Sequence, residues 1–176
     1  EGGSGGGRAA GYRGTAQAAL SAGHDSRAVE RRLGEMKNDW DRRRQALYAS
    51  AKVARDYAYG TGPRQRLDFF HARSKGRPTL AFIHGGYWQW NDKEPNAFIV
   101  EGILAHDVNV ALVDYTLAPA ATMSQIVADI RSAIACLVAR LETELGARRR
   151  LVVAGRSDGG HRPATAAGVR GCAAPL

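Results

Sequence analysis

The sequence predicts an α/β fold in which a mostly parallel sheet is flanked by helices. Three short apolar runs bounded by turn signals are typical of buried strands, at 79–83, 108–113 and 151–154. Apolar residues at helical spacing lie between them, at 95–106 and 122–145. Strands that alternate with helices in this way form a parallel sheet through right-handed crossovers.

The segments outside these runs complete the expected organisation. Apolar residues recur at helical spacing from 26 to 55, which favours a helix packed on a core over a helix lying on a membrane. A further short strand is expected at 67–72. We therefore divide the chain into a flexible glycine-rich leader, an N-terminal helical segment, a core and an irregular tail, at 1–25, 26–56, 57–162 and 163–176.

Composition narrows the class of protein. With 44% hydrophobic and 24% charged residues among 176, the chain is typical of a globular domain. The net charge of +8 is spread along the chain without a nucleic-acid module, so we expect no nucleic-acid partner. Two cysteines are too few for a zinc site, so we expect no metal or cofactor. Neither a membrane span nor a signal peptide is recognisable, which favours a cytoplasmic protein without a membrane partner.

Two motifs follow directly after expected strands. Residues 155–159 read G-x-S-x-G, the pattern of a sharp turn that lifts a serine hydroxyl above the edge of a sheet. His84-Gly85-Gly86 follows the strand at 79–83, and the bare glycine backbone suits N–H groups that stabilise a carbonyl oxyanion. Each motif alone is equally compatible with a plain glycine turn. Together, at the carboxyl ends of two strands, they favour a hydrolytic site.

The residues around these motifs resemble a known family. The stretch from about Tyr57 to Gly160 contains PRQRLDFF, AFIHGGYWQW, VALVDYTLAP and LVVAGRSDGGH. It resembles the α/β-hydrolases, and more narrowly the HGG-motif esterase and lipase branch with its kynurenine formamidase (arylformamidase)-like proteins. The resemblance implies hydrolysis of small-molecule esters or formyl amides by a serine, acid and histidine triad without a metal.

The resemblance also implies a role for individual residues. Ser157 would be the nucleophile, and the backbone N–H groups of Gly85, Gly86 and Asp158 would form the oxyanion hole. His84 would be structural, and Asp114-Tyr115 would pack behind the oxyanion loop. Three aromatic residues would line the substrate pocket, although Trp90 is equally compatible with packing: Tyr87, Trp88 and Trp90.

The sequence also departs from the family pattern. Relatives read GHSAGG where this chain has Arg156 and Asp158 beside the serine. Only 19 residues follow Ser157, with His161 as their one histidine, so we expect a C-terminally truncated core whose later strands, triad acid and base are missing. Such a chain would be inactive alone and would self-associate through the exposed strand at 151–154. A non-catalytic small-molecule-binding or vestigial hydrolase fragment, or a basic structural fragment, remains the alternative.

Overall fold

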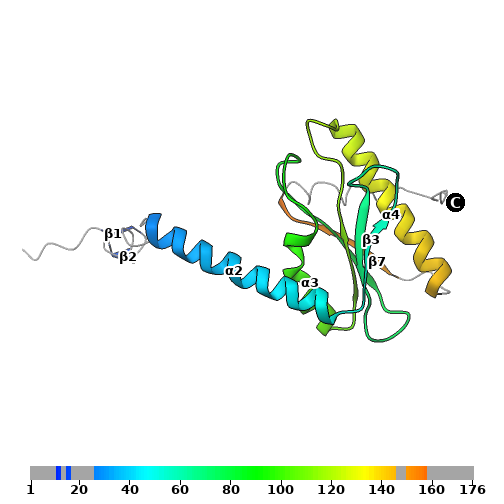
Figure 1. Ribbon diagram of the computed structural model, residues 1–176, viewed down its shortest axis with the longest axis horizontal. Coiled ribbons are helices and arrows are strands. Elements are labelled where there is room, and N and C mark those ends of the chain that lie inside the picture. The colour runs from blue at the N-terminus through cyan, green and yellow to red at the C-terminus, as the bar shows by residue number, and fades with distance from the viewer. Residues whose placement is uncertain (1–10, 13–14, 17–25, 146–149, 158–176) are drawn as a thin grey trace, which may run out of the picture. The chain divides into compact units, whose positions relative to one another are not determined.

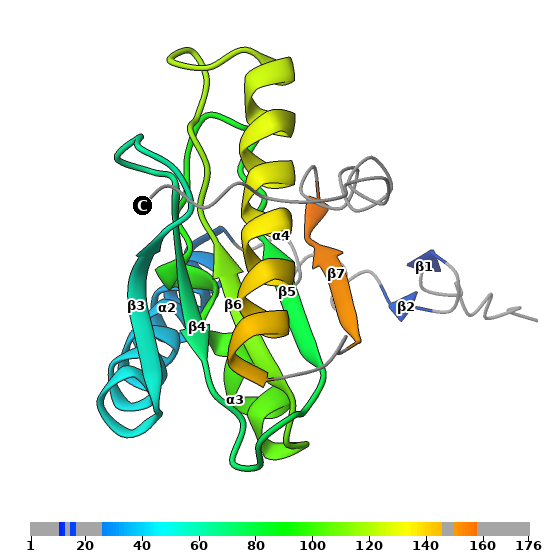
Figure 2. The same cartoon turned by 90° about the vertical axis from the view of Figure 1, so that its right-hand side faces the viewer.

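Five strands form one mixed sheet (Figures 1 and 2). In the order of the sheet they are β3 (Val53–Ala58), β4 (Arg66–Phe70), β6 (Asn109–Val113), β5 (Thr79–Ile83) and β7 (Leu151–Gly155). β5 runs parallel to both β6 and β7, whereas β4 runs antiparallel to β6 and to β3. This computed structural model describes residues 11–12, 15–16, 26–145 and 150–157. The expected α/β class is confirmed, and the strand before the HGG motif lies between the other two parallel strands.

The chain divides into two compact units, residues 1–41 and 42–176. In the first, β1 (Gly11–Tyr12) pairs antiparallel with β2 (Thr15–Ala16), within the stretch expected to be a flexible leader. Helix α2 (Ser26–Ser50) begins in the first unit and ends in the second, which contains the sheet. Among the described helices, none is long and apolar enough to cross a membrane.

The expected helix over 26–55 ends earlier than its apolar spacing indicated. α2 ends at Ser50, and β3 begins three residues later, where Val53 pairs with Phe70 and Ala54 with Phe69. The proposed boundary at 56/57 therefore falls inside a strand. Val53 is compatible with the helical spacing and with a strand, because a single β-branched residue does not distinguish the two. Its pairing with Phe70 on β4 determines that it is a strand residue.

Helices cover both faces of the sheet (Figure 2). Alternate residues of each inner strand point to opposite faces, so Ala81 and Ile83 belong to one core cluster and Phe82 to the other. Helix α4 (Met123–Leu145) packs on the first cluster. The second cluster is covered by the short helix η1 (Glu94–Asn96), by α3 (Phe98–Ala105) and by the end of α2. The single helix expected over 95–106 is thus divided into η1 and α3.

The apolar stripe of α4 is narrower than its sequence indicated. Its buried members recur three or four residues apart and face β4, β5 and β6: Ile126, Ile130, Ile134, Leu137 and Leu141. Met123 and Val138, which the sequence also placed on the stripe, are exposed. The stripe therefore stabilises the sheet through one row of branched side chains.

Replacing Ile130 by alanine is expected to destabilise the fold, because its side chain is 1% exposed and leaves a cavity against the sheet. We expect a loss of about 2–4 kcal/mol in the free energy of unfolding. Val138→Ala is the matched control, since that side chain is 37% exposed and the change costs less than about 1 kcal/mol. Urea unfolding followed by circular dichroism measures both, and equal losses would contradict the burial.

Strand β7 pairs with β5 alone among the described strands, and Val152 on it is 49% exposed. An unpaired apolar edge recruits other chains, and a lysine on such an edge opposes that pairing. We expect Val152→Lys to shift sedimentation of the 176-residue chain toward monomer, whereas Val138→Lys on α4 leaves it unchanged. A monomeric wild-type chain would contradict this prediction.

Candidate active site

The two sequence motifs lie at the same edge of the sheet. Ile83 at the end of β5 is paired in register with Gly155 at the end of β7. The N–H group of Arg156 donates a hydrogen bond to the carbonyl oxygen of Ile83 at 3.2 Å, so the segments that follow β5 and β7 leave the sheet side by side. Neighbouring strands lie about 4.8 Å apart. The register therefore brings the HGG loop and Ser157 together at the carboxyl ends of adjacent parallel strands.

Ser157 has an unusual backbone conformation for a residue with a side chain. Its φ angle is +55°, in the left-handed region, and its side chain is exposed. Ser157 is the second residue after β7, and a left-handed backbone at a residue with a side chain is a strained conformation. Asp158 and His161, two residues that the sequence singled out, lie outside the described residues.

The loop after β5 is the second strained segment. Gly86, Tyr87 and Trp88 have successive φ angles of +135°, +51° and +60°. The carbonyl oxygen of Gly86 accepts hydrogen bonds from the N–H groups of Gln89 and Trp90, at 3.0 and 3.1 Å. A Cβ atom on Gly86 would lie 2.1 Å from the carbonyl oxygen of Trp90, so this position requires glycine. The bare backbone thus permits a loop too tight for a side chain.

His84 lies behind this loop and is almost completely buried. Its ring stacks on Tyr115, with centroids 4.4 Å apart, and Tyr115 donates its hydroxyl hydrogen to the carbonyl oxygen of His84 at 2.8 Å. The two ring nitrogens of His84 face the carbonyl oxygen of Gly85 at 3.0 Å and Oδ1 of Asp114 at 3.2 Å. A neutral ring donates to one of these acceptors, and a charged ring to both. These contacts of His84 with Tyr115, Gly85 and Asp114 therefore hold the start of the loop against the segment that follows β6.

Asp114 follows β6 directly and carries a buried carboxylate. Its Oδ1 atom accepts hydrogen bonds from Nη2 of Arg64 at 2.6 Å and from the N–H group of Tyr115 at 2.9 Å, besides facing His84. Its carbonyl oxygen accepts from the hydroxyl of Tyr59 at 2.6 Å. Burial raises the pKa of Tyr59, as do the charges of Asp129 and Asp114, so this hydroxyl stays a donor. A buried carboxylate requires such compensation.

The motifs did not single out Arg64. Its Nη2 atom reaches both Asp114 and the carbonyl oxygen of Asn91 at 2.8 Å, and its Nε atom donates to the carbonyl oxygen of Tyr115 at 2.9 Å. The planar guanidinium holds three acceptors in fixed directions. Arg64 thus joins the turn before β4 to the loop after β5 and to the segment after β6. Arg64 belongs to the PRQRLDFF stretch, to which the sequence assigns a resemblance but no role.

Lys93 anchors the far end of the same loop and was likewise missed. Its side chain is 6% exposed, and Nζ lies 2.8 Å from Oδ1 of Asp56 and 3.5 Å from Oδ2 of the buried Asp68. Burial alone would lower the pKa of Lys93, but the hydrogen bond to Asp56 and the charge of Asp68 raise it above its usual value. The amino group is therefore charged and ties the loop to β3 and β4.

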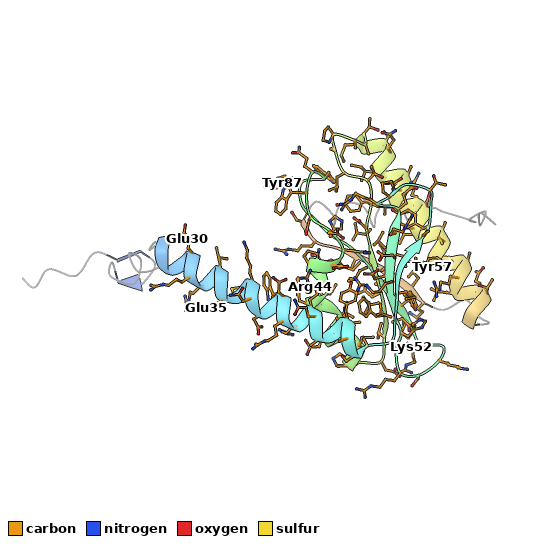
Figure 3. All side chains as sticks on the ribbon, in the orientation of Figure 1. Glu30, Glu35, Arg44, Lys52, Tyr57 and Tyr87 are labelled. Atoms are coloured by element: carbon orange, nitrogen blue, oxygen red, sulfur yellow. The ribbon has the colours of Figure 1, made fainter. Side chains whose placement is uncertain are left out.

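The aromatic residues of the loop differ in exposure. Tyr87 is 70% exposed and projects from the loop (Figure 3), whereas Trp88 is half-buried and packs against the first core cluster. The carbonyl oxygen of Trp88 accepts a hydrogen bond from the N–H group of Ala118 at 2.7 Å. Trp90 is also exposed. No cluster of metal-ligating side chains occurs within the described part of the chain.

The mixed sheet, with β5 parallel to β6 and β7 and helices on both faces, is the architecture of a partial α/β-hydrolase. A solved structure of a putative thioesterase from Silicibacter sp. TM1040 has this fold, with a TM-score of 0.62 and 26% identity over 82% of this chain and 52% of that one. The BD-FAE family model matches residues 67–172, and the chain belongs to this family.

Curated relatives include named hydrolases. A rice (Oryza sativa subsp. japonica) protein described as a probable isoprenylcysteine alpha-carbonyl methylesterase is 30% identical over 116 residues, which are 65% of this chain and 27% of that protein. The kynurenine formamidase of Salmo salar is 28% identical over 113 residues, 63% of this chain and 37% of the enzyme. The chain thus spans well under half the length of these relatives. The resemblance to formamidase-like esterases is confirmed.

Replacing Gly86 by alanine tests the tight loop. The added methyl group would meet the backbone of Trp90, and the φ of +135° disfavours any side chain, so we expect a loss of about 2 kcal/mol or more in stability. Gly102→Ala is the matched control, because a Cβ there meets nothing within 4 Å and alanine favours the helix by about 0.5–1 kcal/mol. Thermal unfolding of both variants is the measurement. Equal changes would mean that the loop does not require glycine.

Proposed function

We propose that this chain forms the nucleophile and oxyanion-hole half of a serine hydrolase that acts on carboxylic esters or formyl amides. The observation that carries the proposal is the left-handed backbone of Ser157. Ser157 comes directly after Arg156, whose N–H group donates a hydrogen bond to Ile83 at the end of β5. The chemistry is acyl transfer to water. The names of the rice and salmon relatives, a methylesterase and a formamidase, support this reaction class because both describe cleavage of an acyl bond.

The proposed mechanism begins with attack by Oγ of Ser157 on the carbonyl carbon of the substrate. The carbonyl electron pair moves onto oxygen, where the backbone N–H groups of Gly85, Gly86 and Asp158 donate hydrogen bonds. Each donor aimed at a forming oxyanion contributes about 3–4 kcal/mol to lowering the barrier. The oxyanion pair then re-forms the carbonyl, the C–O or C–N bond breaks, and the leaving alcohol or amine takes the proton that the base removed from Oγ. Water attacks the acyl-serine in the same way, which releases the acid and returns a proton to Oγ. Tyr87 and Trp88 would contact the acyl or aryl part of the substrate.

Activation of the serine requires a base. A serine hydroxyl is a poor nucleophile until a neighbouring group accepts its proton. After Ser157 the 176 residues contain a single histidine, His161, and a single carboxylate side chain, Asp158. His161 is only four residues from Ser157 and belongs to the same segment. We therefore propose that these 176 residues alone turn over substrate slowly and that an added base accelerates them.

The test is Ser157-dependent acylation of the 176-residue chain. Incubation with p-nitrophenyl acetate, followed by intact-mass and peptide analysis, is expected to give slow acetylation at Ser157 that rises with imidazole as the added base. Ser157→Ala should lose this adduct. Ser132→Ala, which removes an exposed serine on α4, should keep it.

Two outcomes would change the proposal. Ser157-dependent steady-state turnover without imidazole would keep the nucleophile but show that this chain contains its own base. Equal acetylation of the wild type and Ser157→Ala would remove Ser157 from the mechanism and leave the non-catalytic binding alternative.

A further inference from the structure

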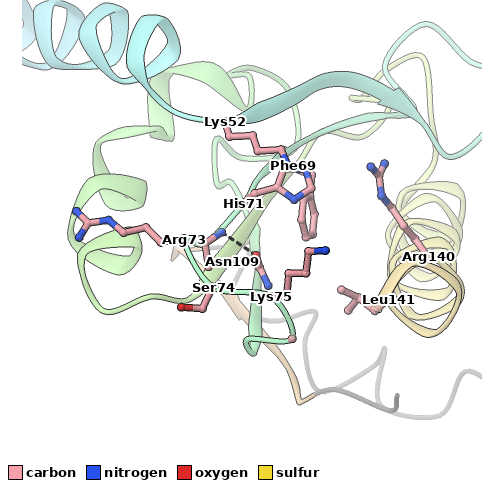
Figure 4. Close-up of a pocket in the computed structure, with 11 residues that line it drawn as sticks. Lys52, Phe69, His71, Arg73, Ser74, Lys75, Asn109, Arg140 and Leu141 are labelled. Carbon is pink, nitrogen blue, oxygen red and sulfur yellow. Dashed lines mark hydrogen bonds between the residues drawn. The ribbon is translucent and has the colours of Figure 1, made fainter. Parts of the chain in front are cut away.

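A basic hollow lies at the opposite edge of the sheet from the candidate active site. It is formed by the loop at 71–78, which joins β4 to β5, together with α4 and Lys52, and has a volume of about 310 Å³ (Figure 4). This edge is where β5 and β6 begin, at Thr79 and Asn109, whereas Ser157 follows a strand that ends at the other edge. The hollow is therefore separate from the proposed catalytic site.

The ionisable side chains that line the hollow are all basic. They come from the residue before β3, the loop and α4: Lys52, His71, Arg73, Lys75 and Arg140. Among the described lining residues none is acidic. Figure 4 shows Lys75 extending from the loop toward Arg140, and Lys52 beside His71, while Arg73 points away from this group. Four positive or protonatable groups thus surround one space.

The acidic groups near the loop are engaged with other cations. Oδ2 of Asp107 lies 2.7 Å from Nε of Arg77, and its Oδ1 accepts a hydrogen bond from the N–H group of Ser74 at 3.0 Å. Glu101, in the neighbouring hollow on the α3 side, pairs with Arg43 at 2.7 Å. The cations that partly neutralise these two carboxylates are Arg77 and Arg43, and neither of them lines the hollow.

The floor of the hollow is apolar and its loop is held in place. Phe69 and Leu141 are buried at its base, and the guanidinium of Arg140 lies over the rings of Tyr57 and Phe69, 4.2 and 5.4 Å from their centroids. Asn109 accepts a hydrogen bond from the N–H group of Ala72 at 2.8 Å (Figure 4) and donates to the carbonyl oxygen of Arg77 at 3.0 Å. The hydrogen bonds of Asn109 thus hold the backbone of the loop from which His71 and Lys75 extend.

We propose that this hollow binds a small organic phosphate. Lys52, His71 and Lys75 surround the phosphate, and a short apolar substituent lies toward Phe69 and Leu141. A dianion suits donors that converge from several segments better than a single carboxylate does, because it offers three acceptor oxygens and more charge. The volume fits a ligand of this size and not a long chain. The inference is independent of the proposed hydrolase activity.

The experiment titrates the full 176-residue chain with phenyl phosphate, using backbone amide NMR shifts to locate and quantify binding. We expect saturable shifts in residues 71–76, weakening with added sodium chloride, and none with benzyl alcohol, which keeps the ring but lacks the charge. The double variant Lys52→Gln/Lys75→Gln should bind about tenfold more weakly. Lys37→Gln is the matched control, an exposed lysine on α2 that does not line the hollow.

The proposal is overturned by the absence of saturable shifts with phenyl phosphate, by equal shifts with benzyl alcohol, or by equal affinity in the double variant and Lys37→Gln. Tighter binding of a short single-stranded oligonucleotide than of phenyl phosphate would also overturn it, because the ligand would then be a phosphate backbone. Since none of these measurements uses Ser157, their failure is distinguishable from failure of the proposed hydrolase function.

Discussion

The structure of the candidate site depends on one buried carboxylate, that of Asp114. Its Oδ1 atom accepts from Arg64 and from the backbone of Tyr115 and faces Nε2 of His84, so one oxygen joins three segments of the chain. Burying a carboxylate without partners would cost several kcal/mol, so the three segments that contact it must fold together. The carboxylate lies at the end of the central strand β6. Its contacts therefore hold the segments of Arg64 and His84 at the edge of the sheet where β5 and β7 also end.

This bracing offsets backbone strain. Three residues with side chains, Tyr87, Trp88 and Ser157, have φ angles near +50° to +60° at the same edge. Such conformations cost roughly 1–3 kcal/mol each and persist only where surrounding contacts determine them. For the loop those contacts are the hydrogen bonds of Gly86, Asn91 and Trp88 to their neighbours. A loop held in this way would meet the requirement of the proposed oxyanion hole, whose donors must be in place before a substrate arrives.

The sequence predicted the three parallel strands and the edge at which they end, because β5, β6 and β7 are short apolar runs and two of them lead into glycine-containing motifs. It missed β3, whose Val53 continued the helical spacing of α2 until pairing with Phe70 decided its conformation. It also missed Arg64 and Lys93. A charged residue in a turn is not part of any repeating pattern of apolar residues. Its partners are also far away in the sequence, Asp114 for Arg64 and Asp68 for Lys93. Contacts of that kind depend on tertiary structure and leave no local signal in one sequence.

The loop after β5 and the turn that contains Ser157 are held in place by different parts of the chain. Every hydrogen bond described for the loop comes from residues between Asp56 and Ala118, before β7 begins. The conformation of the loop therefore does not depend on the group that takes the serine proton. Ser157 joins this assembly through the register of β7 with β5 and the hydrogen bond from Arg156 to Ile83. A change that loosens β7 would thus displace Ser157 together with Asp158, the residue bonded to it, and leave the loop after β5 in place, so the loop and the serine can be separated by mutation.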